Sequence, residues 1–158
     1  MKLLNLLIIA ATLLLVSCGG SRNTVSTATK SSSKYAISFE KTDKLMPILD
    51  RAKAENKLVF VDVYADWCMP CKMMDRDVFT DPALGRFMNE NFINVKIDAE
   101  KGNGGNVASI FEVYAYPTLL FLDANGRVLE RKVGAAYQTE MRKLANSAIQ
   151  QSQAVGMR

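Results

Sequence analysis

Two cysteines, Cys68 and Cys71, are the residues best suited to chemistry in this chain, and they stand two positions apart in the stretch DWCMPCK. Cysteines at this spacing can exchange thiols for a disulfide, hold a metal ion or close a short structural loop. A loop of this size stabilises a fold little. Tetrahedral zinc needs four ligands, whereas the sequence has one further cysteine, Cys18, and no histidine. These features favour a redox centre over a zinc site or a structural staple.

The methionines around the pair are compatible with binding of one metal ion, Cu(I). Met69, Met73 and Met74 add soft thioether ligands to the two thiols, and such a set suits Cu(I). At helical spacing, however, Cys71, Met74 and Val78 form one stripe that would face a sheet, which predicts that Met74 packs in the core. Binding or transfer of Cu(I) stays as an alternative function of this segment.

The N-terminus has the pattern of a bacterial export signal. Lys2 precedes an apolar run of about 14 residues, which is shorter than the roughly 20 residues that span a bilayer as a helix. The run ends in LVSC, which resembles the lipobox, where a signal peptidase cuts before a cysteine that becomes diacylated. This resemblance implies a signal peptide over residues 1–17 and lipidation of Cys18, followed by a flexible tether, rich in Ser and Thr, up to residue 35. Cys68 and Cys71 are then left as a pair in an oxidising compartment.

The charge distribution excludes one class of partner. Of the 20 lysines and arginines, Lys2, Arg22, Lys30 and Lys34 lie in the first 35 residues, so the rest of the chain carries 16 basic against 16 acidic residues. A neutral domain without a basic stripe lacks the electrostatic footprint of a nucleic-acid-binding protein. We therefore expect no nucleic-acid partner.

The remaining sequence alternates between strand and helix patterns and predicts the elements that must position the cysteines. An apolar, β-branched run over 57–65 is typical of a strand buried on both faces, and a helix should begin at the cysteines directly after it. Asp43 and Asp81 are predicted to cap helices, with Pro82 in the first position of the second. The expected strands cover 36–39, 57–65, 93–98, 117–123 and 127–133, the last two joined by a turn at Asn125-Gly126, and the expected helices cover 43–56, 68–79, 81–92, 106–112 and 138–149.

At this point the chain resembles the thioredoxin family. The resemblance rests on VDVYADWCMPCK, on NVKID, and on YPTLLFLDANGRVLERKVG some 45 residues after the cysteines, and it spans roughly residues 36–150. It implies an α/β thioredoxin-like fold, a central mixed β-sheet flanked by helices, with a C-terminal tail over 151–158. DWCMPCK together with the downstream FTDPAL looks most like the C-terminal periplasmic domain of the disulfide reductase DsbD and its small exported relatives.

The chemistry of the pair follows from its place at a helix start. Unpaired backbone N–H groups and the helix dipole would stabilise the thiolate of Cys68, which makes it the expected nucleophile. Cys71, one turn along and expected to be more buried, would resolve the mixed disulfide. Asp62 matches the buried acid that in the family assists proton transfer to the resolving cysteine. The family's lysine near that acid falls here on Asn94, with Lys96 two positions on, which leaves the charge partner of Asp62 open.

The residues expected to contact substrate surround the pair. Trp67, Met69 and Pro70 adjoin the cysteines in sequence. Pro117 matches the cis-proline of the family, and this resemblance implies that the backbone of Tyr116, with Thr118 following, faces Cys68 and pairs with an extended substrate strand. Trp67 is expected either on this docking surface or in the general core.

These features predict an exported lipoprotein that reduces disulfides of proteins or small thiols outside the cytoplasm without an organic cofactor. Pro70 matches the reducing members of the family, whereas strongly oxidising members carry a histidine beside the nucleophile, and this chain has none. The resemblance implies a membrane electron donor of the DsbD type. The location would be the periplasm-facing bacterial envelope, with the anchor at Cys18 in the inner or outer membrane. A disulfide oxidase, the Cu(I) protein and a tethered binding module remain as alternatives.

Overall fold

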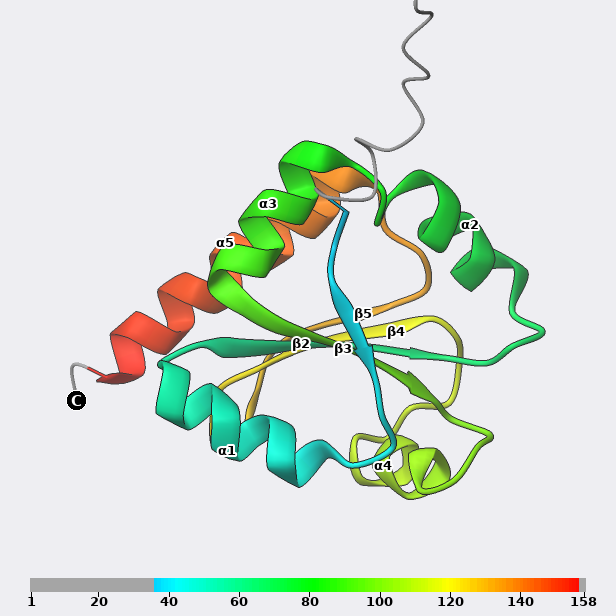
Figure 1. Ribbon diagram of the computed structural model, residues 1–158, viewed down its shortest axis with the longest axis horizontal. Coiled ribbons are helices and arrows are strands. Elements are labelled where there is room, and N and C mark those ends of the chain that lie inside the picture. Colours follow the sequence, from blue (N-terminus) through cyan, green and yellow to red (C-terminus); the bar gives the residue numbers. More distant parts are fainter. Residues whose placement is uncertain (1–35, 157–158) are drawn as a thin grey trace, which may run out of the picture.

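The computed structural model describes residues 36–156, which form a single mixed sheet between helices (Figure 1). The predicted signal peptide over 1–17, the lipidation site Cys18 and the whole of the tether lie outside the described residues. Within the described part, no helix combines the length and apolar content needed to cross a bilayer. The elements are β1 (Phe39–Lys41), α1 (Leu45–Glu55), β2 (Leu58–Tyr64), α2 (Met69–Asp77), α3 (Pro82–Asn91), β3 (Phe92–Asp98), α4 (Gly104–Ile110), β4 (Thr118–Leu122), β5 (Val128–Val133) and α5 (Gln138–Gly156).

The strands are ordered β1-β3-β2-β4-β5. β1 and β2 both pair with β3 in parallel, whereas β4 pairs antiparallel with β2 and β5. The central place of β2 explains its continuous apolar sequence, because helices cover both faces of the sheet. The predicted edge strand is present but covers Phe39–Lys41 rather than 36–39. The predicted α/β fold with a central mixed sheet is confirmed.

Two apolar clusters fill the spaces on either side of the sheet. One lies between the sheet and the pair α1 and α4, and the other lies between the sheet and α2, α3 and α5 (Figure 1). Successive residues of a strand point to opposite faces. Val61 and Val63 therefore face α1 and α4, while Phe60 and Asp62 lie on the face covered by α2.

The register of β3 against β2 decides which polar residues meet under α2. Phe60 pairs with Asn94 and Asp62 pairs with Lys96. Asn94 and Lys96 alternate with residues of the opposite cluster, so both point to the same face as Asp62. The register therefore places Lys96 beside Asp62, while Asn94, the position where the family carries its lysine, lies beside Phe60.

One of the two predicted helix caps is correct. The Asp81 carboxylate accepts a hydrogen bond from the amide of Leu84 at 2.7 Å and caps α3, with Pro82 in its first turn. Asp43 does not cap α1, which begins at Leu45 without a side-chain cap. Its carboxylate instead accepts a hydrogen bond from the amide of Asn103 at 3.0 Å and ties the start of α1 to the loop before α4.

Two helices and the last hairpin differ in detail from expectation. α4 begins at Gly104, two residues early, and α5 continues to Gly156 rather than ending at residue 149, so most of the predicted tail is helical. The predicted hairpin is present, but its turn is longer than the two-residue turn expected from Asn125-Gly126. Gly126 adopts a φ of 82°, and the carboxylate of Asp123 accepts hydrogen bonds from the amides of Asn125 and Arg127. A side chain that satisfies the loop amides makes the longer turn stable.

Candidate active site

Cys68 stands at the junction of β2 and α2. It is the N-cap residue of α2, and Pro70 lies in the first turn, where a missing N–H is harmless. Cys68 and Cys71 are joined as a disulfide with their Cα atoms 5.3 Å apart. The amide of Cys71 donates a hydrogen bond to Cys68 Sγ at 3.2 Å. The same amide would stabilise a thiolate on Cys68 after reduction, because the helix N-terminus favours negative charge there.

The pair is covered rather than open to solvent. Each cysteine is only 2% exposed, and Ala65 lies with them in a small cluster against which Tyr64 and Tyr116 pack. The expectation that Cys71 is the more buried of the two is wrong, since their exposures are equal. The cause is the cover supplied by neighbouring side chains, which sequence spacing does not predict.

A buried ion-pair network lies close to Cys71, the expected resolving cysteine. Lys96 Nζ contacts Asp62 Oδ2 at 2.6 Å and Asp75 Oδ1 at 2.5 Å, so one ammonium group serves two carboxylates. Asp62 is 1% exposed and Lys96 is 6% exposed, whereas Asp75 is half exposed. Asp75 is a residue that the sequence analysis missed. Its position four residues after Cys71 on α2 was the available signal, because residues at this spacing share a helix face.

The ammonium group of Lys96 lies among aromatic rings. It is 4.8 Å from the ring centre of Tyr64 and 5.2 Å from the ring centres of Phe39 and Phe79. A cavity of about 130 Å³ is lined by Cys71, Asp75 and Lys96 among others. The cavity has room for water, so it could connect the sulfur of Cys71 with the ion-pair network.

Burial sets the protonation of this network. Burial raises the pKa of the Asp62 carboxyl, opposed by the charge and hydrogen bond of Lys96 and reinforced by the charge of Asp75. Burial by itself lowers the pKa of Lys96, but the two carboxylates outweigh it and raise that pKa. Asp62 Oδ1 is buried and has no hydrogen-bond partner. A raised pKa makes the Asp62 carboxylate a better proton acceptor than an ordinary exposed aspartate.

The residues expected to contact substrate differ in exposure and in their contact with the pair. Trp67 is 65% exposed, which places it on the surface and excludes the core position that the sequence left open. Met69 and Pro70 are exposed beside it. The Tyr116–Pro117 peptide is cis, as the resemblance implies. Thr118 is buried, and its hydroxyl donates to the carbonyl oxygen of Ala115 at 2.8 Å, so it shapes the proline loop from within.

The methionines do not form one cluster. Met74 is buried against the sheet, as its helical spacing predicts, while Met69 and Met73 are exposed. Residues 36–156 contain no group of three or more His, Cys, Asp or Glu side chains that could hold a metal ion.

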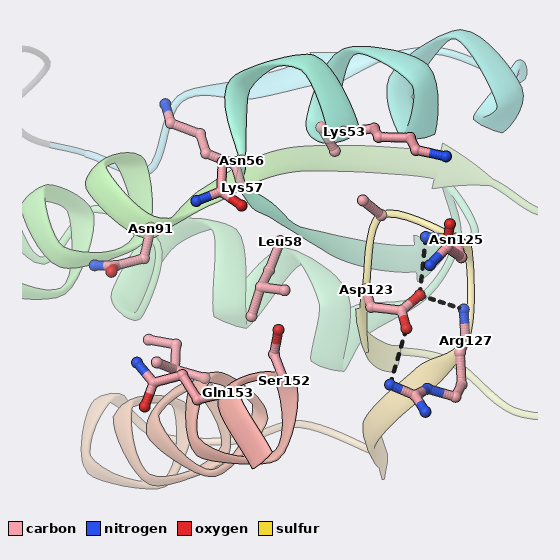
Figure 2. A pocket seen from close by; sticks show the side chains of 13 residues that line it. Lys53, Asn56, Lys57, Leu58, Asn91, Asp123, Asn125, Arg127, Ser152 and Gln153 are labelled. Carbon is pink, nitrogen blue, oxygen red and sulfur yellow. Dashed lines mark hydrogen bonds and ion pairs between the residues drawn. The ribbon is translucent and has the colours of Figure 1, made fainter. Parts of the chain in front are cut away.

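A second cavity, of about 550 Å³, lies at the opposite end of the strands (Figure 2). It includes Leu58 at the start of β2, Ser152 of α5 and the β4–β5 turn. Its carboxylate, Asp123, is engaged by the turn amides and by Arg127 at 3.0 Å, as the dashed lines in Figure 2 show. None of the residues predicted to act on a disulfide lines this cavity.

Comparisons with known proteins agree with this geometry. A protein-family model described as Thioredoxin-like matches residues 44–124. The protein DsbD of Tatumella citrea, named a thiol:disulfide interchange protein, is 28% identical over 117 residues, which are 73% of this chain and 20% of that protein. Thioredoxin H4 of Arabidopsis thaliana is 39% identical over 87 residues, which are 55% of this chain and 68% of that protein. The chain thus spans a fifth of this DsbD protein and about two thirds of the thioredoxin.

Two solved structures are also similar to this chain. A solution structure from Bacteroides thetaiotaomicron, named as a candidate disulphide-isomerase, is 38% identical, with a TM-score of 0.63 over 71% of this chain and 93% of that chain. A thioredoxin from Thermus thermophilus, at 22% identity and a TM-score of 0.66, shares the fold.

Proposed function

This chain belongs to the thioredoxin-like family and is a thiol–disulfide oxidoreductase whose paired cysteines are Cys68 and Cys71, and from that premise we propose that it works as a disulfide reductase outside the cytoplasm. The observation that carries the exchange chemistry is the position of Cys68 as N-cap of α2, where the amide of Cys71 donates to its sulfur. Such a site lowers the pKa of a thiol and produces the attacking thiolate.

The reaction would run in two exchanges. The Cys68 thiolate attacks one sulfur of a substrate disulfide, forms a mixed disulfide and releases the other substrate sulfur as a thiolate. The Cys71 thiolate then attacks Cys68 Sγ, releases the second substrate thiolate and leaves the disulfide seen here. Two electrons pass from the pair to the substrate. Asp62 would accept the proton of Cys71 through the cavity that Cys71 and Lys96 line.

The residues around the pair would bind the substrate. The exposed side chains of Trp67, Met69 and Pro70 form one wall of the approach. The cis Tyr116–Pro117 peptide would lie in the other wall, where the backbone of Tyr116 would pair with an extended strand of the substrate, while Thr118 is buried behind it and would not contact substrate.

Two features support reduction over oxidation. Pro70 occupies the second place between the cysteines, and the sequence contains no histidine that could stabilise the thiolate further. A less stabilised thiolate makes the dithiol a better reductant. Because one turnover oxidises the pair, a donor must reduce it again. We expect a membrane electron donor of the DsbD type, and relatives carrying that name are consistent with this.

A redox titration of the pair tests the direction. The purified protein is equilibrated in glutathione buffers, and its state is read by thiol alkylation and by the fluorescence of Trp67. A midpoint reduction potential below about −220 mV supports a reductase, whereas a potential of about −120 mV would make the protein an oxidase. Cys71→Ser should trap a mixed disulfide with substrate, and Cys68→Ser, its matched control, should trap none.

The location rests on the N-terminal pattern, and we propose that the protein is lipid-anchored at Cys18 in the bacterial envelope, facing the periplasm. A diacylated N-terminus has the two chains that stable anchoring needs. Cys18→Ala should move the protein from the membrane fraction to the soluble periplasmic fraction and remove the lipid mass from the N-terminal peptide. A protein that stays at the membrane without lipid would contradict this assignment.

A further inference from the structure

A chain of side-chain contacts leads from an exposed carboxylate to the buried disulfide. Both oxygens of Glu100 accept the indole N–H of Trp67, at 2.9 and 3.0 Å. The Trp67 ring meets the Tyr116 ring edge to face, with 5.9 Å between the ring centres. Tyr116 packs on the cluster that contains Cys68 and Cys71. Glu100 therefore reaches the redox pair through two rings.

The carboxylate is itself held in place. The amide of Glu100 donates to the carboxylate of Asp98 at 3.0 Å. The next residue, Lys101, forms ion pairs with Asp98 at 3.1 Å and with Asp66, the neighbour of Trp67. The loop after β3 is thus joined to the segment before the nucleophile at two adjacent positions, and it offers Glu100 as a fixed acceptor.

Trp67 needs such an anchor. Its side chain is 65% exposed, so packing alone does not fix its rotamer, whereas the cysteines below Tyr116 are 2% exposed. The hydrogen bond to a charged acceptor is the specific interaction that holds the indole against Tyr116. Without it, the Trp67 ring would turn away and Tyr116 would lose its outer support.

We propose that Glu100 is a positioning residue that braces Trp67 against Tyr116, so that the covered pair reacts with protein disulfides in preference to small ones. The proposal rests on the reductase function above. A substrate must displace the rings to reach Cys68. An extended protein segment offers apolar side chains that repack against Trp67 and Tyr116, and this binding energy offsets the displacement. A small disulfide makes no such contacts, so nothing offsets the free energy needed to displace the two rings.

Three variants of the full chain, purified in detergent, test the brace. Glu100→Ala removes the acceptor, Glu100→Gln keeps an oxygen that can accept the indole N–H, and Glu90→Ala is the control at an exposed glutamate of α3. The first readout is the rate at which dithiothreitol reduces the Cys68–Cys71 disulfide, followed by alkylation and mass. Glu100→Ala should speed this reaction about three- to tenfold, the range for loss of one hydrogen bond, while Glu100→Gln and Glu90→Ala should match the wild type.

The second readout is specificity, measured as the kcat/KM for insulin divided by that for hydroxyethyl disulfide, a small neutral substrate. This ratio should fall about three- to tenfold in Glu100→Ala and recover in Glu100→Gln. A general loss of structure would lower both kcat/KM values together and leave the ratio unchanged. The fluorescence of Trp67, the sole tryptophan of the chain, should also become more quenchable by acrylamide in Glu100→Ala alone.

Several outcomes overturn the proposal. They are an unchanged rate and ratio in Glu100→Ala, a Glu100→Gln variant that behaves like Glu100→Ala, or an equal change in Glu90→Ala. A wild-type chain that reduces neither insulin nor the small disulfide would instead refute the proposed function. In that case the dithiothreitol rates would still decide whether Glu100 keeps the pair covered.

Discussion

Lys96→Met is the substitution that most directly tests the buried network. Lys96 is the cation that both Asp62 and Asp75 contact, so its removal leaves the buried carboxyl of Asp62 without a charge partner. Methionine conserves most of the side-chain volume among the surrounding aromatic rings, which keeps the change electrostatic. We expect the variant to be less stable than the wild type at neutral pH and to match it in acid.

The size of the loss has a ceiling, because the Asp62 carboxyl can always take up a proton. An aspartate in the unfolded chain has a pKa of about 3.9. At a pH above both pKa values, each unit by which the folded pKa exceeds this value lowers the unfolding free energy by about 1.4 kcal/mol. At pH 7 the loss from this carboxyl is therefore at most about 4 kcal/mol. Since its pKa is raised, not lowered, the loss is absent below about pH 4 and grows as the pH rises. In the wild type, too, the unfolding free energy falls as the pH rises through this range, but less steeply, because Lys96 opposes the rise in the pKa of Asp62.

Urea denaturation at pH 4 and pH 7, followed by circular dichroism, measures this difference. The matched control is Lys132→Met, which breaks a surface ion pair with Glu140 and should change the unfolding free energy by less than about 1 kcal/mol at either pH. Adding Asp62→Asn to Lys96→Met should restore most of the stability, because no charge is then left buried. The reasoning fails if the loss is equal at both pH values, or if the second substitution does not reverse it.

Three further predictions concern other positions. The charge of Asp75 raises the pKa of Asp62, so Asp75→Asn should lower that pKa and flatten the dependence of the unfolding free energy on pH between 4 and 7; an unchanged slope would contradict this coupling. A Cβ on Gly104 would lie 1.9 Å from a backbone carbonyl oxygen, so Gly104→Ala should destabilise the fold by about 1–3 kcal/mol in a thermal melt. Gly105→Ala, whose nearest contact is 3.3 Å, should change the melting temperature little, and equal effects would refute the clash. Asp81→Ala removes the cap of α3 and should lower the unfolding free energy by about 1 kcal/mol in urea, with no change expected if the cap is unimportant.

The sequence predicted the parts of the site that depend on local pattern. Cys68 and Cys71 follow a strand and begin a helix, and this alone placed one sulfur at a helix N-terminus. The buried position of Asp62 followed from the apolar run around it. The partner of Asp62 could not be predicted, because Asn94 and Lys96 share one face of β3 and only the pairing register selects between them.

The same limit applies to the surface around the pair. The sequence favoured a docking surface over core packing for Trp67 only slightly, since an aromatic residue after a strand suits both. Asp75 and Glu100 were not singled out at all. Acidic residues on a helix or in a loop are common on protein surfaces, and their role arises only from the partners they meet, Lys96 and Trp67.

The sequence by itself determined the fold class, the order of the elements and the identity of the redox pair. These follow from the alternation of strand and helix patterns and from the spacing of two cysteines, and both are properties of neighbouring residues. The tertiary structure decided which side chains surround the sulfurs: Lys96 beside Asp62, Asp75 sharing its ammonium group, and Tyr116 covering the disulfide. These contacts join residues about 20 to 50 positions apart, and they depend on strand register and helix packing, which no local pattern encodes.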